Sequence, residues 1–342
     1  MTLNVNASAS ESTLSRALPW LLFPPVALFL SAVITGPGPL DRPGSTLDLV
    51  VQQEDKHDQN FYANAHPYLE EPLKKLVKHI PELKGLRPEA NQQALPMILE
   101  MSGDRVDAFF RDVVDVLAHE EIAQNRLDRS GAIEASQLVQ DSYLILRHGQ
   151  ETGANIDEYR MDNKGNRMDK VGLDKGLFVT SGFALSCNYF STAFQPESRF
   201  LFLGNERIGQ RDTYVVAFAQ KPGKATLFVT MTERGGARVH MLMQGIMWAD
   251  KSNFQIIRTR LDLLAPRPEI GLDQLTTVVT LNRVQLRNVI TPLWLPKEVK
   301  VYVKFRHVDS DHGRLYEREY RNEHHYADYR RYRVSVKINP QQ

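Results

Sequence analysis

The segment Val299-Lys300-Val301-Tyr302-Val303-Lys304-Phe305 alternates apolar residues with lysine or tyrosine along its whole length. A period of two residues is typical of a β-strand with one face toward an apolar interior and the other toward water. The segment Val334–Ile338 repeats this alternation, with Ser335 and Lys337 at its polar positions. Antiparallel sheets commonly have one covered and one solvated face, so these strands predict such a sheet.

Further strand-like runs precede this segment. Between about Arg199 and Ile338, apolar alternation recurs and is interrupted by turn sequences such as Glu233-Arg234-Gly235-Gly236. An earlier hairpin is predicted where Asp162-Asn163-Lys164-Gly165-Asn166 separates two short runs. We therefore expect one large antiparallel sheet to dominate the fold.

Methionines gather in this strand-rich half. Met241, Met243 and Met247 have the same parity, so they are expected to share one face of a strand. Methionine adapts to irregular apolar partners, so this face either accommodates an apolar ligand or packs beneath a helix. The residues predicted to form a lipid-facing wall are Met241, Met243, Met247, Val216, Phe218, Val301 and Val303.

Helical periodicity precedes and interrupts the strands. Over residues 46–130, apolar residues recur every three or four positions. Gly103 is expected to end the second of these stripes, and the last stripe covers residues 106–117. Ser181–Phe194 predicts another helix that packs on the sheet. We expect an α+β fold, in which a helical N-terminal segment precedes a curved antiparallel half-barrel with packed helices over residues 131–342.

An uncharged apolar run, Ala17–Ile34, follows Arg16 and precedes a Pro/Gly-rich linker. A basic residue, an apolar run and a breaker in this order are typical of a secretory signal, and the run approaches the length that spans a bilayer. A buried core helix is the alternative, and cleavage of the run stays open. Residues 1–45 are thus predicted to hold a disordered N-terminus, a signal or membrane anchor at residues 17–34, and a linker. This predicts a periplasmic or cell-envelope protein.

Composition excludes several classes of protein. The net charge is +1, so the chain lacks the basic excess of a nucleic-acid-binding protein. Cys187 is the sole cysteine, which excludes a disulfide scaffold, and its apolar neighbours predict a buried thiol. The sequence contains no phosphate-binding loop, dinucleotide fingerprint or nucleophile elbow. We therefore expect no cofactor, no catalytic residue and no enzymatic activity.

Candidate metal ligands are weak. His119-Glu120-Glu121 resembles the start of a zinc-protease helix, but Ala123 stands where the second histidine belongs, so a solvated helix end is expected. His324 and His325 are adjacent and would point to opposite faces of a strand, so they are expected to be polar residues of a surface strand. No metal site is predicted. An enzyme would have to use the polar residues Asp309, Asp311, His312 and His324.

One pattern in the N-terminal half resembles known proteins. Ile80-Pro81-Glu82-Leu83-Lys84-Gly85-Leu86, followed by Gly103 and Phe109-Phe110, resembles part of a family of exported acidobacterial proteins of undefined function. This resemblance implies export and a helical N-terminal segment.

A second pattern lies in the strand-rich half. Gly245–Arg258, Leu263–Arg267 and Leu293–Pro296 resemble the same exported proteins and, more distantly, the LolA-type periplasmic lipoprotein carriers and their sigma-regulator relatives. This resemblance implies a curved antiparallel sheet that wraps helices and presents an apolar concave face to acyl chains. It carries over no individual binding residue.

The leading hypothesis is a non-enzymatic cell-envelope protein that binds a lipid, a lipoprotein or another amphiphile on the concave face of the sheet. The alternative is an envelope sensor or scaffold that binds another protein through a sheet edge or the helical segment. An enzyme ranks third. The sequence leaves open whether the helices fill the hollow of the sheet.

Overall fold

The structure is a computed structural model of the 342-residue chain. It describes residues 27–29, 61–148, 155–162, 179–181, 183–232, 238–308 and 315–332. The two predicted turns centred on residues 164 and 235, the last predicted strand, and the polar residues Asp309, Asp311 and His312 lie outside the described residues.

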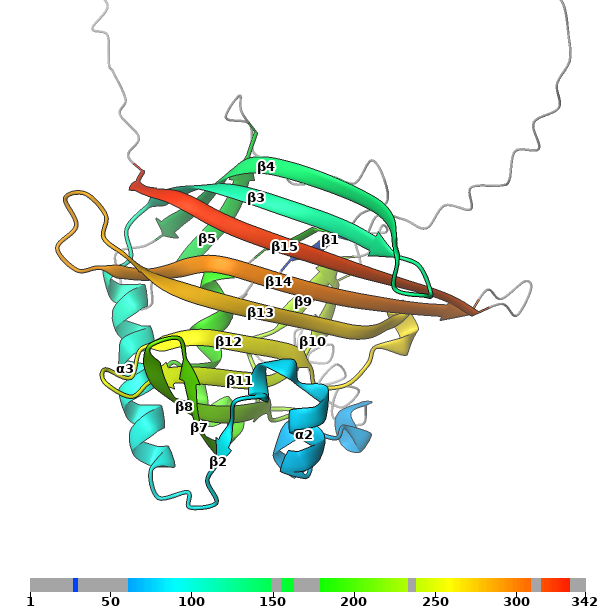
Figure 1. Ribbon diagram of the computed structural model, residues 1–342, viewed down its shortest axis with the longest axis horizontal. Coiled ribbons are helices and arrows are strands. Elements are labelled where there is room, and N and C mark those ends of the chain that lie inside the picture. The colour runs from blue at the N-terminus through cyan, green and yellow to red at the C-terminus, as the bar shows by residue number, and fades with distance from the viewer. Residues whose placement is uncertain are drawn as a thin grey trace, which may run out of the picture.

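Eleven of the strands in the described residues form one antiparallel sheet, which dominates the fold (Figure 1). Its ends are β2 and β5, which do not pair with each other, so the sheet is open and curved. The predicted α+β class with a large curved antiparallel sheet is confirmed. In spatial order the strands are β2 (Arg87–Pro88), β7 (Ser198–Ile208), β8 (Arg211–Gln220), β11 (Met243–Asp250), β12 (Ile256–Leu263), β13 (Leu272–Val284), β14 (Leu293–Val308), β15 (Leu315–Arg331), β3 (Val116–Leu127), β4 (Ile133–His148) and β5 (Asn155–Met161).

The face of the sheet that carries Val301 is called the inner face. Residues paired directly across neighbouring antiparallel strands project to the same side, so the register gives the members of this face. Val299, Val301 and Val303 are buried there, whereas Lys300 and Lys304 on the opposite face are partly exposed, as their alternation predicts. One row of paired inner-face residues comprises Val216, Met247, Thr259, Val279, Val299, His324 and Ile122.

Two helical elements cover the inner face, α3 (Leu95–Asp112) and the 3-10 helix η5 (Ala184–Phe190). Their apolar side chains join the main hydrophobic core together with the inner face of the sheet. The two elements contact each other closely at Gly103, where an added Cβ would lie 2.6 Å from Gln195 Nε2 and 3.2 Å from the Phe190 carbonyl oxygen. We call α3 and η5 together the cover.

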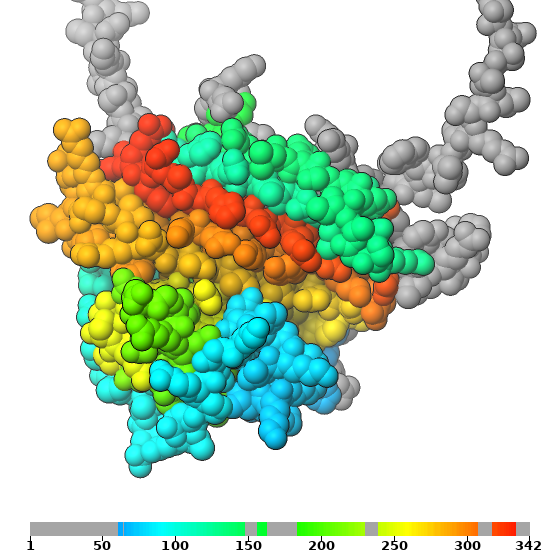
Figure 2. Space-filling model, in the orientation of Figure 1, coloured from blue at the N-terminus to red at the C-terminus, as the bar shows by residue number. Residues whose placement is uncertain are grey.

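The opposite, outer face is covered over part of its width by a second helical group. It consists of η2 (Tyr68–Glu70), α2 (Leu73–His79) and η3 (Pro81–Leu83). Leu76, Ile80 and Leu83 of this group form a second buried core with Trp248 and Ile257 of the sheet. In Figure 2 these residues, in blue and cyan, lie over the lower part of the face, while the orange, red and green strands above them are open. The N-terminal helices thus lie on the far side from the cover.

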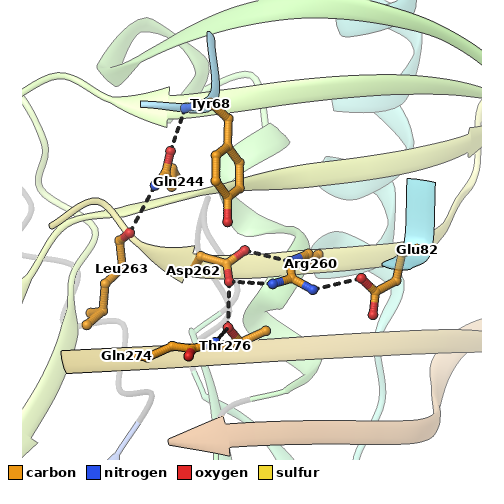
Figure 3. A network of polar contacts seen from close by, with 8 residues as sticks. All are labelled: Tyr68, Glu82, Gln244, Arg260, Asp262, Leu263, Gln274 and Thr276. Carbon is orange, nitrogen blue, oxygen red and sulfur yellow. Dashed lines mark hydrogen bonds and ion pairs between the residues drawn. The ribbon is translucent and has the colours of Figure 1, made fainter. Parts of the chain in front are cut away.

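Figure 3 shows a polar network that fastens this outer group to the sheet. Arg260 on β12 donates to both carboxylate oxygens of Asp262, at 2.7 and 2.9 Å, and to Glu82 of η3 at 2.7 Å. The Tyr68 amide donates to the Gln244 side chain of β11 at 2.7 Å. The buried Arg260 guanidinium thus pairs with a carboxylate of the sheet and with one of the helices. Because both pairs are needed to balance its charge and donors, the network fixes the position of the helices relative to the sheet.

The secondary structure differs from the sequence prediction in three places. The helical region expected over residues 46–130 ends at Asp112, and Val116–Leu127 is strand β3 of the large sheet. Gly103, expected to end one helix, lies inside the single helix α3. The helix expected over Ser181–Phe194 is the shorter 3-10 helix η5. The division of the chain at residues 45 and 130 stays a prediction.

A small sheet accompanies the large one. Its order is β10 (Arg238–Met241), β9 (Val229–Thr232), β1 (Ala27–Phe29) and β6 (Val179–Ser181). Strand β1 is the described part of the apolar run at residues 17–34. Among the described residues, no helix is both long and apolar enough to cross a membrane. The remaining 3-10 helices are η1 (Tyr62–Asn64), η6 (Gln195–Glu197) and η7 (Pro268–Ile270).

Candidate functional site

The predicted lipid-facing residues all lie in the main core. Val216, Phe218, Met243, Met247, Val301 and Val303 project from the inner face of the large sheet, and each is buried. Met241 differs from the prediction, because Leu242 interrupts the strand and places Met241 in β10 of the small sheet. It still joins the same core. The structure thus brings these residues into one apolar interior.

The cover lies directly on this wall. The Tyr189 ring of η5 stacks on Phe218 with centroids 5.1 Å apart, and the Phe190 ring meets Phe218 edge-on at 5.0 Å. Gly245 opposite Phe218 leaves room for its ring, since an added Cβ would lie 2.8 Å from Phe218 Cε1. The cover therefore closes off this part of the wall.

The inner face becomes polar toward β15, β3, β4 and β5. Glu120 on β3 and His324 on β15 are both 0% exposed. The Glu120 carboxylate accepts two hydrogen bonds from Arg160 of β5, at 2.6 and 2.7 Å, and one from the Tyr326 hydroxyl at 2.7 Å. His324 Nδ1 lies 2.8 Å from the same carboxylate. Side chains of three strands, β3, β5 and β15, thus meet at one buried carboxylate.

Electrostatics fix the charge state of this group. Burial alone would raise the pKa of Glu120, but the Arg160 guanidinium and the His324 hydrogen bond outweigh burial and hold it well below its usual range. Burial lowers the pKa of His324 despite the neighbouring carboxylate, so the imidazole is neutral at pH 7. Its Nδ1 then donates to Glu120 and its Nε2 carries a lone pair.

A second carboxylate connects the polar group to the cover. Glu158 on β5 accepts the Tyr143 hydroxyl and the backbone amides of Phe183 and Ala184, the two amides at 2.9 Å each. These amides stand at the start of η5. Burial raises the pKa of Glu158 to about 7, although the three donors favour its ionised form. Glu158 therefore anchors the cover to the sheet through a group that titrates near neutral pH.

Several buried polar atoms of the interior have no hydrogen-bond partner among the described residues. On the inner face they include Thr259 Oγ1, Thr277 Oγ1, Asp141 Oδ2 and His324 Nε2. In and beside the cover they include the hydroxyls of Ser102, Ser186 and Ser191. Buried polar atoms are almost always hydrogen-bonded, so these atoms mark places in the interior where a further polar partner would fit.

The sequence did not predict the buried polar residues on the inner face of β15, β3, β4 and β5. Glu120 was expected at a solvated helix end and His324 on a surface strand, and both are fully buried. The alternation Val116, Ala118, Glu120, Ile122 is the signal that places Glu120 on an apolar face, provided that the segment is taken as a strand. His325 is exposed, as expected for the neighbour of an inward residue.

Cys187 is buried, as its apolar neighbours predict. Burial raises the pKa of the Cys187 thiol to about 12, so at neutral pH it is a protonated core side chain. Within the described ranges, no three His, Cys, Asp or Glu side chains are grouped so that they could hold a metal ion.

A surface groove of about 270 Å³ opens beside the cover. It lies between α3 and the residues around the β13–β14 connection, and it is lined by Arg105, Phe109, Arg283, Leu293 and Trp294 among others. Phe109 and Leu293 also contact the main core. The groove therefore brings solvent to the edge of the apolar interior.

Comparison with known proteins gives structural likeness only. No protein-family model and no curated protein sequence matches the chain. One solved structure, described as an outer membrane lipoprotein-sorting protein domain from Vibrio parahaemolyticus, is 13% identical to this chain. The comparison covers 71% of this chain and 94% of that chain, with a TM-score of 0.34.

Two other solved structures are similar to the same degree or less. A DUF1329 family protein from Desulfovibrio piger is 13% identical over 71% of this chain and 94% of that chain, with a TM-score of 0.29. The Pseudomonas aeruginosa MucA/MucB complex gives 10% identity over 67% of this chain and 94% of that chain, with a TM-score of 0.20. Likenesses this weak support no conclusion about activity, ligand or partner.

Proposed function

We propose that this chain is a non-enzymatic cell-envelope protein that binds a lipid, a lipoprotein's acyl chain or another amphiphile on the inner face of its sheet. One observation carries the proposal. The inner face is apolar over β8 and β11 to β14, the apolar half, whereas over β15, β3, β4 and β5, the polar half, buried charged and polar groups lie among its apolar residues. These two halves match the two parts of an amphiphile. The apolar run at residues 17–34 supports export or tethering to the envelope.

The apolar half suits a flexible chain. Met243 and Met247 supply side chains that can rearrange around different guests, and Val301 and Val303 continue the same surface across β14. A guest would replace the contacts that Tyr189 and Phe190 of η5 make with Phe218. The guest would thereby bury the apolar surface that becomes exposed when the cover is displaced.

The cover is built to move as a unit. Gln195 donates to the carbonyl oxygens of Leu99 on α3 and of Phe190 on η5, at 2.8 Å each, so the two elements are tied together. Toward the sheet, η5 begins at the amides held by Glu158. A 3-10 helix has poorer hydrogen-bond geometry than an α-helix, which lowers the cost of displacing it.

The first test is a measurement of bound lipid. The full chain, purified from membranes in mild detergent, is expected to carry lipid in native mass spectra, and the delipidated chain is expected to bind a fluorescently labelled fatty alcohol. Val301→Phe adds volume to the wall and should weaken this binding, with Val303→Ile as a milder variant. Tyr302→Phe, on the outer face of the same strand, is the control. Absence of both bound lipid and alcohol binding in the unmodified chain would refute the proposal.

A scaffold that binds another protein is the second candidate. Strand β4 exposes Ile133 and Leu138, which are 62% and 61% accessible. Within the described part of the chain, β5 pairs with β4 only from Ser142 to His148, so the first half of β4 has β3 as its partner. Such an edge can accept an added strand. This candidate predicts that Leu138→Lys abolishes a cross-linked envelope partner, whereas Val301→Phe leaves it intact.

A further inference from the structure

Around Glu120, the inner face holds more acidic than basic side chains. Asp141 on β4 feels the charges of Glu120 and of Asp162, both of which oppose its ionisation, and the opposing effect of Arg160. The Arg160 guanidinium is already held by Glu120 through two donors. His324 adds no positive charge, because burial lowers its pKa. The described charges therefore leave this region with an unbalanced negative potential.

Asp141 has the one carboxylate oxygen in this region that points to a missing donor. The residue is 5% exposed, and its Oδ2 has no hydrogen-bond partner among the described residues. Burial, reinforced by the Glu120 charge, raises the pKa of Asp141 to about 6. A buried carboxylate gains most from a partner that brings both positive charge and N–H donors.

His324 offers a second unmatched acceptor. Its Nδ1 faces Glu120, so in the neutral ring Nε2 is the acceptor, and this atom also has no partner in the described part of the chain. Register places His324 diagonally beside Glu120, and Glu120 directly beside Asp141. The two unmatched acceptors therefore flank the same carboxylate on neighbouring strands.

Aromatic rings line the same region. Tyr143 and Tyr326 have ring centroids 4.8 Å apart, and the Phe183 ring lies 4.9 Å from the His324 ring. The two tyrosine hydroxyls are engaged by Glu158 and Glu120, which fixes the rings in place. Aromatic faces attract ammonium groups, most strongly where water is excluded.

From these acceptors, charges and rings we infer that the polar half of the inner face binds the ammonium group of an amine-bearing amphiphile. The inference rests on the proposed function, since it names the head group of the guest whose chain lies on the apolar half. An organic ammonium fits better than a metal ion, because no group of metal ligands exists within the described residues. An anionic head group would meet the carboxylates and is disfavoured.

The distances across the sheet suit such a guest. Asp141 on β4 and Val301 on β14 are separated by three strand-to-strand steps, about 14 Å at about 4.8 Å per step, and by four residues along the strands, about 13 Å at about 3.3 Å per residue. A head group at Asp141 therefore directs a chain of ordinary lipid length across β15 and onto the valine and methionine wall.

The test compares two probes that differ only in their head group, dodecylamine and dodecanol, both below their micelle concentrations. Isothermal titration of the full chain is expected to show that the amine binds at least about tenfold more tightly, the equivalent of one charge-assisted hydrogen bond. Asp141→Asn should bring the two affinities together. Glu134→Gln, an exposed carboxylate of the same strand, should leave the preference unchanged.

The outcomes separate this inference from the proposed function. Equal affinities for amine and alcohol in the unmodified chain, or a preference that survives Asp141→Asn, would overturn the ammonium site while the alcohol binding still supports an amphiphile site. If neither probe binds, both proposals fall.

A pH profile of the unmodified chain gives an answer even where Asp141→Asn does not fold. The amine preference should grow as the pH rises through about 6, where Asp141 ionises, and a flat preference would overturn the inference. The other titratable or charged groups facing this site are Glu120 on β3, Arg160 on β5, Asp162, and His324 and Tyr326 on β15; His119, on the outer face of β3, acts on Asp141 only through its charge.

Discussion

Glu158 gives the structure a specific pH dependence. Its pKa is raised from the ordinary 4.5 to about 7 by burial. A carboxyl group with a raised pKa in the folded state contributes stability below its unfolded pKa and loses it as the pH rises through the folded value. For this shift, the contribution falls by about 2.5 kcal/mol between about pH 5 and about pH 8. The chain is therefore expected to lose this stability toward alkaline pH.

The assay is urea unfolding followed by tryptophan fluorescence, with the fully buried Trp248 as a reporter. Glu158→Gln keeps the shape of the side chain and removes its titration, so other ionisable groups cancel in the difference between the two proteins. The free energy of unfolding of the unmodified chain, minus that of Glu158→Gln, should decrease by about 2.5 kcal/mol over this range. A difference that is constant with pH, or that increases, would show that Glu158 is not a buried anchor of the cover.

Three further outcomes follow from the same interior. Glu120→Gln leaves the buried Arg160 charge without its counterion and should lower the free energy of unfolding in urea by about 3–5 kcal/mol. The control Glu121→Gln, on the outer face, should lower it by less than about 0.5 kcal/mol. Equal costs for the two substitutions would contradict the buried pair. Gly103→Ala displaces the Gln195 amide and should cost about 1–3 kcal/mol in the same assay, and a neutral result would refute the close contact within the cover. Maleimide labelling of Cys187 should be slow in the unmodified chain and faster in Glu158→Gln, because the thiol becomes accessible only when the cover opens; identical rates would separate the anchor from the cover.

The strands of the C-terminal half were predictable from sequence because their alternation is strong. Val299 to Phe305 has the register and the buried face that its pattern indicates. Met243 and Met247 share a face for the same reason, whereas the break at Leu242 that separates Met241 has no sequence signal comparable to a glycine or proline. Alternation therefore predicts which face of the sheet a residue lies on. The prediction holds only as far as the strand continues without interruption.

The polar half of the inner face was not predictable in the same way. Val116–Leu127 is rich in Ala, Glu and Leu, which favour helices, and it becomes a strand because β15 and β4 pair with it on both sides. His324 and Glu120 are separated by more than half of the chain, so their contact depends on that pairing. Local sequence carries no information about a partner brought in by the fold.

The pairing of β15 with β3 also has a kinetic consequence. The last long strand of the described chain lies between β14 and β3, so the unit formed by β3, β4 and β5 joins the rest of the sheet only through residues Leu315–Arg331. Contacts between such distant segments close large loops, which slows folding. Strands β3, β4 and β5 can therefore join the rest of the sheet only after nearly the whole chain has been synthesised. A chain truncated after Val308 would leave two sheet fragments with exposed edges.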